Sequence, residues 1–191
     1  GTPLSAWLKL DDRQLEIDLT PNRGDCLSIN GMARELSALT KTRLRRPVMK
    51  PAAIKSKVRR KVTLKAGKDC PHYAGRVIEG LDTTAVTPMW MVERLRRSGV
   101  RSIHPVVDVT NYVMLELGQP MHGFDLDKLS GDIQVRPARK GEQLALLDGN
   151  TVTLEAGSLL IADARGPLAL AGVMGGMHSA VSAATTQIFL E

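Results

Sequence analysis

The chain has 191 residues, and 43% of them are hydrophobic, so it can bury the core of one full domain and part of another. It contains no apolar run near the roughly 20 residues that a membrane-spanning helix needs, and its first residues lack the basic and apolar regions of a signal peptide. Two cysteines, Cys26 and Cys70, are too few for a zinc site and offer no disulfide framework. We therefore expect a globular cytoplasmic protein without membrane contact, whose cysteines are reduced packing residues.

The net charge of +6 comes from one short segment. Residues 43–61 hold nine Lys or Arg and no acid, whereas the rest of the chain carries 17 basic and 20 acidic side chains. Pro47 and Pro51 interrupt this segment, which has no steady periodicity, so we interpret it as an exposed basic connector between two folded units. Contact with the phosphates of a nucleic acid is the alternative.

The sequence pattern over residues 1–42 predicts a small unit that is too short to fold well alone. Alternating polarity over residues 15–19 predicts a strand, and a Pro-Asn-Arg-Gly-Asp turn follows it at residues 21–25. A helix is expected from about Ser28, which can cap it. Apolar residues then recur at helical spacing, at Ile29, Met32, Ala33, Leu36 and Leu39. We expect this unit to be the second half of a domain whose first half is missing.

Two helices are predicted in the middle of the chain. The first follows Thr87 as the cap, with Pro88 at its first position, and Gly99 closes it. The second runs over about residues 108–117 and is ended by Gly118. Its apolar face would consist of residues at positions i, i+3, i+4 and i+8, namely Val109, Tyr112, Val113 and Leu117.

Strands dominate the remaining sequence. Residues 61–64 and 73–78 read as strands before the helices, and residues 133–136, 159–162, 168–173 and 187–190 read as strands after them. A hairpin is expected around Asp148-Gly149, between residues 144–147 and 152–154. The predicted fold class is α+β, a mixed-sheet domain with a central helical section, preceded by a small partial unit of helix and strand.

One stretch holds more polar residues than packing requires. Thr110 and Asn111 lie beside the apolar face of the second central helix, and the Gln-Pro exit at residues 119–120 leads to a constrained turn that presents His122 and Asp125. Imidazole titrates near neutral pH, so His122 is a candidate for contact with a substrate or with water near a scissile ester; a histidine that merely caps a turn is the alternative. Asp125 is expected to order the loop by accepting backbone N–H groups.

The pair Gly175-Gly176 follows an apolar strand. Adjacent glycines either allow a tight turn with positive φ or leave room for the close approach of a ligand. The sequence has no phosphate-binding loop that ends in Lys-Ser or Lys-Thr, no Gly-x-Ser-x-Gly elbow and no histidine pair at zinc spacing. We therefore expect any catalysis to proceed without a metal or a covalent intermediate.

Three long stretches, in the same order along the chain, resemble one family. They are TPNRGDCLSINGMAREL at residues 20–36, VVDVTNYVMLELGQPMHGFD at 106–125 and LALAGVMGGMHS at 168–179. The chain closely resembles the beta chain of bacterial phenylalanyl-tRNA synthetases over nearly its whole length. The resemblance implies that residues 1–42 close a split N-terminal domain and that residues 62–191 form most of the B3/B4 editing domain, truncated at its C-terminus. It does not predict the basic connector at residues 43–61, which follows from the charge pattern alone.

The resemblance also implies a function and a site. The editing domain is expected to hydrolyse misacylated Tyr-tRNA(Phe) by attack of water on the aminoacyl ester. His122, Gly175 and Glu191 would line the pocket, Arg101 and Asn111 would help to frame it, and the carboxylate of Glu191 would accept a hydrogen bond from the phenol of the misattached tyrosine. The sequence departs from the family pattern at Gly123, where a residue with a side chain is more usual.

The expected partners are tRNA(Phe) and the alpha subunit of the ligase in an alpha2-beta2 assembly. By the same resemblance, ATP and Mg²⁺ serve the aminoacylation site of the alpha chain, and no cofactor or metal is expected in this fragment. The competing hypothesis is a non-catalytic scaffold or tRNA-binding module that uses the basic connector. A phosphate binder would lose affinity steeply with salt and ignore the amino acid on the tRNA.

Overall fold

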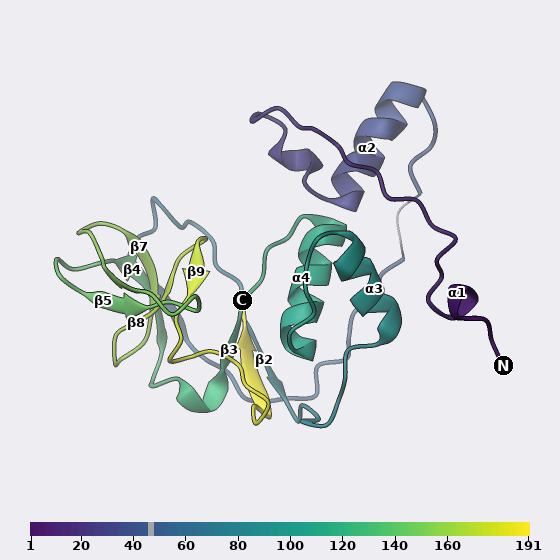
Figure 1. Ribbon diagram of the computed structural model, residues 1–191. Helices are drawn as coiled ribbons and strands as arrows, with labels where there is room; N and C mark the ends of the chain where they lie inside the picture. The colour runs from purple at the N-terminus through teal and green to yellow at the C-terminus, as the bar shows by residue number, and fades with distance from the viewer. Residues whose placement is uncertain (46–47) are drawn as a thin grey trace. The chain divides into compact units, whose positions relative to one another are not determined.

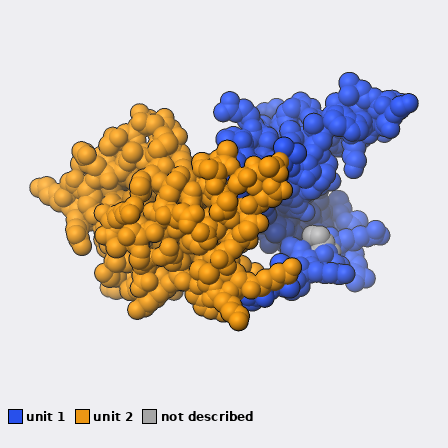
Figure 2. Space-filling model, turned by 90° about the horizontal axis from the view of Figure 1, so that it is seen from below, with its two compact units in different colours: residues 1–54, 85–121 blue, residues 55–84, 122–191 orange. Residues whose placement is uncertain are grey.

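The computed structural model describes residues 1–45 and 48–191 and combines helices with several β-sheets, as the sequence predicts (Figure 1). The chain divides into two compact units, each built from two separate segments (Figure 2). Unit 1 comprises residues 1–54 and 85–121, and unit 2 comprises residues 55–84 and 122–191. This grouping differs from the predicted division at residues 42 and 61, because the central helices group with the N-terminal residues. The predicted domain boundaries stay a prediction. Arg46 and Pro47 of the expected connector lie outside the described residues.

Unit 1 is helical. Its helices are α1 (Leu4–Trp7), the short 3-10 helix η1 (Gly24–Cys26), α2 (Ile29–Thr40), α3 (Met89–Arg97) and α4 (Pro105–Leu117). The strand expected over residues 15–19 is not formed, so that prediction was wrong. An alternating sequence needs a partner strand to become a β-ladder, and alternation alone does not supply one. Within the described ranges, no helix is both long and apolar enough to cross a membrane.

Helix α2 begins where the sequence predicts. The hydroxyl of Ser28 accepts a hydrogen bond from the backbone N–H of Gly31 at 3.0 Å, which satisfies one of the free donors of the first turn. The expected apolar stripe is nevertheless not buried, since Ile29, Leu36 and Leu39 are 68%, 54% and 70% exposed. Helical spacing therefore predicted the helix correctly and its packing wrongly.

The buried side chains of α4 are polar. Asp108 accepts hydrogen bonds from the hydroxyls of Thr87 and Ser102 and from the backbone N–H of Ile103, and its carboxylate lies in the first turn, where the helix dipole favours negative charge. The hydroxyl of Thr87 donates to Asp108 and does not cap α3, whose N-cap is Pro88. The predictions of Thr87 as the cap and of Pro88 as the first helical residue were therefore wrong. Val109, expected on the buried face, is 48% exposed. Burial on α4 thus follows the hydrogen bonds at its N-terminus and not the apolar repeat.

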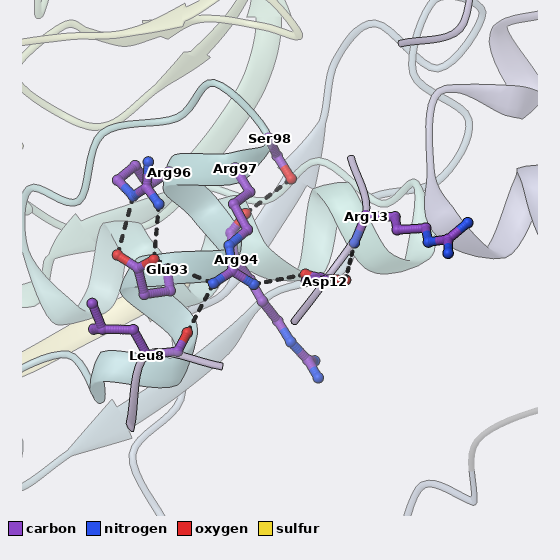
Figure 3. A network of polar contacts seen from close by, with 8 residues as sticks. All are labelled: Leu8, Asp12, Arg13, Glu93, Arg94, Arg96, Arg97 and Ser98. Carbon is purple, nitrogen blue, oxygen red and sulfur yellow. Dashed lines mark hydrogen bonds and ion pairs between the residues drawn. The ribbon is translucent and has the colours of Figure 1, made fainter. Parts of the chain in front are cut away.

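Arg97 of α3 forms hydrogen bonds with the N-terminal segment of unit 1 (Figure 3). Its guanidinium donates to the carboxylate of Asp12 at 2.6 Å and to the backbone carbonyl of Leu8 at 2.8 Å. Glu93 accepts from Arg97 at 3.4 Å and from Arg96 at 2.9 Å. These contacts give the irregular residues near Leu8 and Asp12 a fixed position on the helix.

Unit 2 consists of three sheets. A five-stranded sheet has the order β1 (Val62–Leu64), β4 (Ile133–Pro137), β7 (Leu159–Ala162), β8 (Pro167–Leu170) and β9 (Met174–Gly175). A three-stranded sheet has the order β2 (Arg76–Glu79), β10 (Gln187–Leu190) and β3 (Gly123–Asp125), and the hairpin of β5 (Gln143–Ala145) and β6 (Thr151–Thr153) forms the third. Only the β1–β4 pair is parallel among these strands. The strands predicted at 159–162 and 187–190 are confirmed to the residue.

One core joins the two larger sheets of unit 2. Its fully buried members come from both sheets, with Phe124 and Phe189 from the three-stranded sheet and Ile133 and Val135 from the five-stranded one. Apolar side chains from two facing sheets must be buried against each other, because neither sheet could cover its inner face alone. Across this packing, Gly175 of β9 lies against His122, the residue that precedes β3, and this contact positions the site described next.

Candidate functional site in unit 2

The register between β3 and β10 puts His122 opposite Glu191. Phe189 pairs with Phe124, and the ladder continues one pair beyond the strands, where the backbone N–H of His122 donates to the carbonyl of Glu191 at 3.2 Å and the reverse bond is 2.9 Å long. Opposite residues of an antiparallel pair share a face of the sheet, and so do residues two apart in a strand. His122, Phe124, Phe189 and Glu191 therefore project from one face.

The imidazole of His122 is packed against an aromatic ring and a glycine. It meets the ring of Phe124 edge-on, with the centroids 4.6 Å apart at 77°. The imidazole also lies against Gly175 of β9, where an added Cβ would stand 2.6 Å from Nε2 of His122. Gly175 has no positive φ, so the glycine serves close approach and not turn geometry. The approaching group is the imidazole itself.

The buried nitrogen of this imidazole has no partner. Nε2 of His122 is inaccessible to solvent and accepts or donates no hydrogen bond among the described residues. Burial lowers the pKa of His122 below its usual value of 6.5, so the ring is neutral near pH 7. A neutral imidazole carries one N–H donor and one acceptor nitrogen. Because unpaired buried polar atoms are rare and costly, Nε2 is a candidate contact for a ligand or a water molecule.

Glu191 lies on the same face as a half-buried carboxylate. Burial raises its pKa above the usual 4.5, and a hydrogen bond from the phenol of Tyr73 to Oε2 opposes that rise. Burial also raises the pKa of Tyr73, with the charge of Glu191 acting in the same direction, so the phenol stays protonated and acts as the donor. The carboxylate and the phenol therefore form a defined pair next to His122.

Sequence reasoning did not single out Tyr73. Its ring stacks on Phe189, with the centroids 6.4 Å apart at 13°, and Phe189 stacks on Phe124 at 6.5 Å. The chain has only two tyrosines and two phenylalanines, and three of these four rings lie here. That concentration could have pointed to the site only after the register of β2, β10 and β3 was known.

Arg101 and Asn111 belong to unit 1. Arg101 is exposed in the segment between α3 and α4, and Asn111 is half-buried on α4. Their part in framing the pocket stays a prediction. Asp125, by contrast, behaves as expected, because its carboxylate accepts from the backbone N–H of Asp127 at 3.1 Å and from the hydroxyl of Thr185 at 2.7 Å. Gly123 is held inside β3 opposite Leu190.

The described part of the basic connector is largely exposed. Its exposed cations are Arg43, Arg45, Lys50, Lys55, Lys57, Arg59 and Lys61. Arg60 is half-buried and donates to the backbone carbonyl of Gly131 at 2.9 Å.

Comparison with known proteins places this geometry in a family. The model of the B3/4 domain family matches residues 69–191, a span that holds the whole site. The chain belongs to the B3/4 domain family. Its B3/4 region is also part of a longer similarity, which confirms the resemblance seen in the sequence.

Two curated relatives are similar to the chain over its full length. The phenylalanine–tRNA ligase beta subunits of Methylococcus capsulatus and Hahella chejuensis are 56% and 57% identical to it. The chain spans 24% of the length of each relative. Among solved structures, an N-terminal fragment of the phenylalanyl-tRNA synthetase beta subunit from Pyrococcus horikoshii matches 99% of this chain and 62% of that chain, with a TM-score of 0.53 and 20% identity. This last match supports the fold alone.

Proposed function

We propose that the chain is the editing region of a phenylalanine–tRNA ligase beta subunit and that it hydrolyses the ester of misacylated Tyr-tRNA(Phe). The observation that carries the proposal is the buried, unpartnered Nε2 of His122 on the same sheet face as the Glu191 carboxylate. Packing alone requires neither a free imidazole nitrogen nor a buried carboxylate at this place.

The proposed reaction is attack of water on the aminoacyl ester. The oxygen of water bonds to the carbonyl carbon, the bond from that carbon to the terminal ribose oxygen breaks, and the proton of the water passes to the ribose oxygen. Neutral His122 offers one N–H donor and one acceptor nitrogen to the water or the ester oxygen, because burial keeps the ring uncharged near pH 7. Gly175 allows the imidazole to occupy its position.

Glu191 would supply the selection of tyrosine. An apolar pocket that merely tolerates an extra hydroxyl discriminates by only about 10²-fold, whereas a site that hydrogen-bonds the hydroxyl discriminates by about 10⁴-fold or more. A phenylalanyl ester would leave the half-buried carboxylate without that partner. The correct product would then escape hydrolysis.

The wider assembly belongs to the same proposal. The partners would be tRNA(Phe) and an alpha subunit in an alpha2-beta2 ligase of the cytoplasm, with ATP and Mg²⁺ used at the alpha subunit. The relatives named above support this because they are beta subunits of that ligase by name.

The test is deacylation of Tyr-tRNA(Phe) and Phe-tRNA(Phe) by the full-length synthetase. Glu191→Ala should lose most of the preference for tyrosine, and Gly175→Trp should block hydrolysis by displacing His122. Glu155→Ala, which removes an exposed carboxylate elsewhere in unit 2, is the matched control and should behave as wild type. If Glu191→Ala and Gly175→Trp both leave selective release of tyrosine unchanged, the site assignment is wrong.

The exposed cations of the connector favour a second candidate, a tRNA-binding scaffold. The two functions differ in the part of the aminoacyl-tRNA that is recognised. A scaffold would bind tRNA(Phe) with steep salt dependence and equal affinity for both aminoacyl forms, whereas an editing site would distinguish tyrosine from phenylalanine even in a small aminoacyl-adenosine ester.

A further inference from the structure

The phenol of Tyr73 reaches the carboxylate that the proposed function assigns to the substrate. Its Oη donates a hydrogen bond to Oε2 of Glu191, although the two residues are 118 positions apart in sequence. Both side chains are half-buried. A hydrogen bond of this kind to a desolvated carboxylate is stronger than a neutral one and fixes the direction of its acceptor.

The ring of Tyr73 is itself held in place. It stacks on Phe189, which is 1% exposed and whose side chain leaves β10 on the same face as Glu191. Gly75 provides the space for this arrangement, because a side chain there would collide with the ring of Phe189. Tyr73 lies in the irregular segment just before β2, and the stacking on Phe189 supports its ring where the phenol meets Glu191.

The bond from Tyr73 occupies one oxygen of the carboxylate. An ionised carboxylate offers two oxygens with about four acceptor sites in all, so Oε1 keeps its capacity. We propose that Tyr73 is a positioning residue for substrate selection, whose phenol holds Oε2 of Glu191 so that Oε1 receives the phenol of the substrate's tyrosine. This inference rests on the proposed function and adds to it a residue that acts through Glu191.

The charges of the pair agree with this role. Burial raises the pKa of Glu191 and so favours its protonated form, while the bond from Tyr73 opposes that rise. A protonated carboxyl group would lose much of its demand for a phenol donor, and with it the ability to reject phenylalanine. Tyr73 thus helps to keep Glu191 both ionised and aligned.

The experiment is Tyr73→Phe in the full-length synthetase, which keeps the stacked ring and removes only the hydroxyl. The value of kcat/KM for Tyr-tRNA(Phe) should fall about tenfold, while slow hydrolysis of Phe-tRNA(Phe) stays unchanged. The preference for tyrosine should also be lost at a higher pH than in wild type on acidification, because Glu191 protonates more easily without its donor. A merely structural role would not shift this pH profile.

Three controls show whether a change in Tyr73→Phe comes from the loss of any phenol, from Glu191 or from the fold. Tyr112→Phe removes the phenol of the other tyrosine, which accepts from Arg94 in unit 1, and should match wild type. In a Glu191→Ala background, Tyr73→Phe should cause no further loss of selectivity, because the residue acts through that carboxylate. Equal thermal unfolding midpoints of Tyr73→Phe and wild type would show that the fold is intact.

Three outcomes would overturn the inference. If Tyr73→Phe lowers KM for Tyr-tRNA(Phe) and leaves kcat unchanged, the phenol of Tyr73 competes with the substrate and does not position Glu191. If Tyr73→Phe equals wild type in rate and pH profile while Glu191→Ala loses selectivity, the inference fails and the proposed function stands. If wild type itself shows no preference for tyrosine, both fail.

Discussion

Replacing Gly175 with alanine tests the packing at the centre of the site. The new methyl group would lie 2.6 Å from Nε2 and 3.3 Å from Nδ1 of His122, and Cε1 would be nearer still. Ordinary contact between such atoms is about 3.5 Å, so the imidazole must move by about 1 Å. The ring of Phe124, whose centroid lies 4.6 Å from that of the imidazole, restricts that movement. We expect a stability loss of about 1–3 kcal/mol and a fall in the rate of Tyr-tRNA(Phe) hydrolysis of about 100-fold.

The assay for Gly175→Ala combines single-turnover deacylation with thermal unfolding of the same preparation. Gly67→Ala is the matched control, since Gly67 lies in unit 2, has no positive φ and has open space where its Cβ would stand. The control should keep both the rate and the unfolding midpoint. A Gly175→Ala protein that hydrolyses Tyr-tRNA(Phe) at the wild-type rate would refute the claim that the glycine exists to admit the imidazole.

Further predictions concern protonation, burial and charge. Because burial lowers the pKa of His122, the rate of hydrolysis should stay level as the pH falls from about 8 through 6.5. The free energy of unfolding should decrease below about pH 6.5, where the unfolded state binds the proton more readily than the folded state. Profiles of rate and of stability against pH check both expectations, and His122→Gln should remove that part of the stability change. Asp108→Asn should lower stability by about 1–3 kcal/mol in urea unfolding, since a fully buried acceptor of three bonds is weakened, and an unchanged midpoint would contradict this. Arg136 pairs with Glu142 and holds the pKa of Glu142 at about 2. The stability that this pair contributes should therefore be present above pH 4.5 and disappear as the pH falls towards 2. In Glu142→Gln, the free energy of unfolding should lose this part of its dependence on pH. If the connector contacts tRNA, Lys55→Ser combined with Lys57→Ser should reduce the slope of log affinity against log salt by about 1–2, and an unchanged slope would exclude these two contacts.

Local patterns predicted much of unit 2. The apolar runs at residues 159–162 and 187–190 became β7 and β10, and the Asp148-Gly149 turn joins β5 to β6 as expected. Each of these elements is signalled by its own few residues, whatever strand it later pairs with, and that is where composition and spacing carry information. The same holds for Ser28, whose hydroxyl caps α2 as predicted.

The failures depended on distant partners. The alternating residues at 15–19 form no strand, and the apolar stripe of α2 is exposed, because neither has a complementary surface within the described chain. The strand β3 was missed because three residues beginning with glycine carry no period, and its pairing with β10 lies more than 60 positions away. Burial of Asp108 likewise depends on Thr87, which is 21 positions earlier.

The candidate site could be anticipated only in part. Resemblance to a family indicated His122, Gly175 and Glu191, and the structure brings these three together in unit 2. The spacing of these residues in the sequence gave no sign that they lie together, because their strands become neighbours only when the sheets form and pack. Tyr73 was missed for the same reason, since its bond to Glu191 depends on a register that the sequence does not display.

The most direct measurement of the central claim is single-turnover deacylation of Tyr-tRNA(Phe) and Phe-tRNA(Phe) by the wild-type full-length synthetase, with His122→Ala and His178→Ala beside it. The account predicts release of tyrosine about 10⁴-fold faster than release of phenylalanine, well above the roughly 10²-fold of a pocket that merely tolerates the hydroxyl. It also predicts loss of that release in His122→Ala and its retention in His178→Ala, whose imidazole is exposed. Equal release of the two amino acids, or wild-type release of tyrosine by His122→Ala, would contradict it.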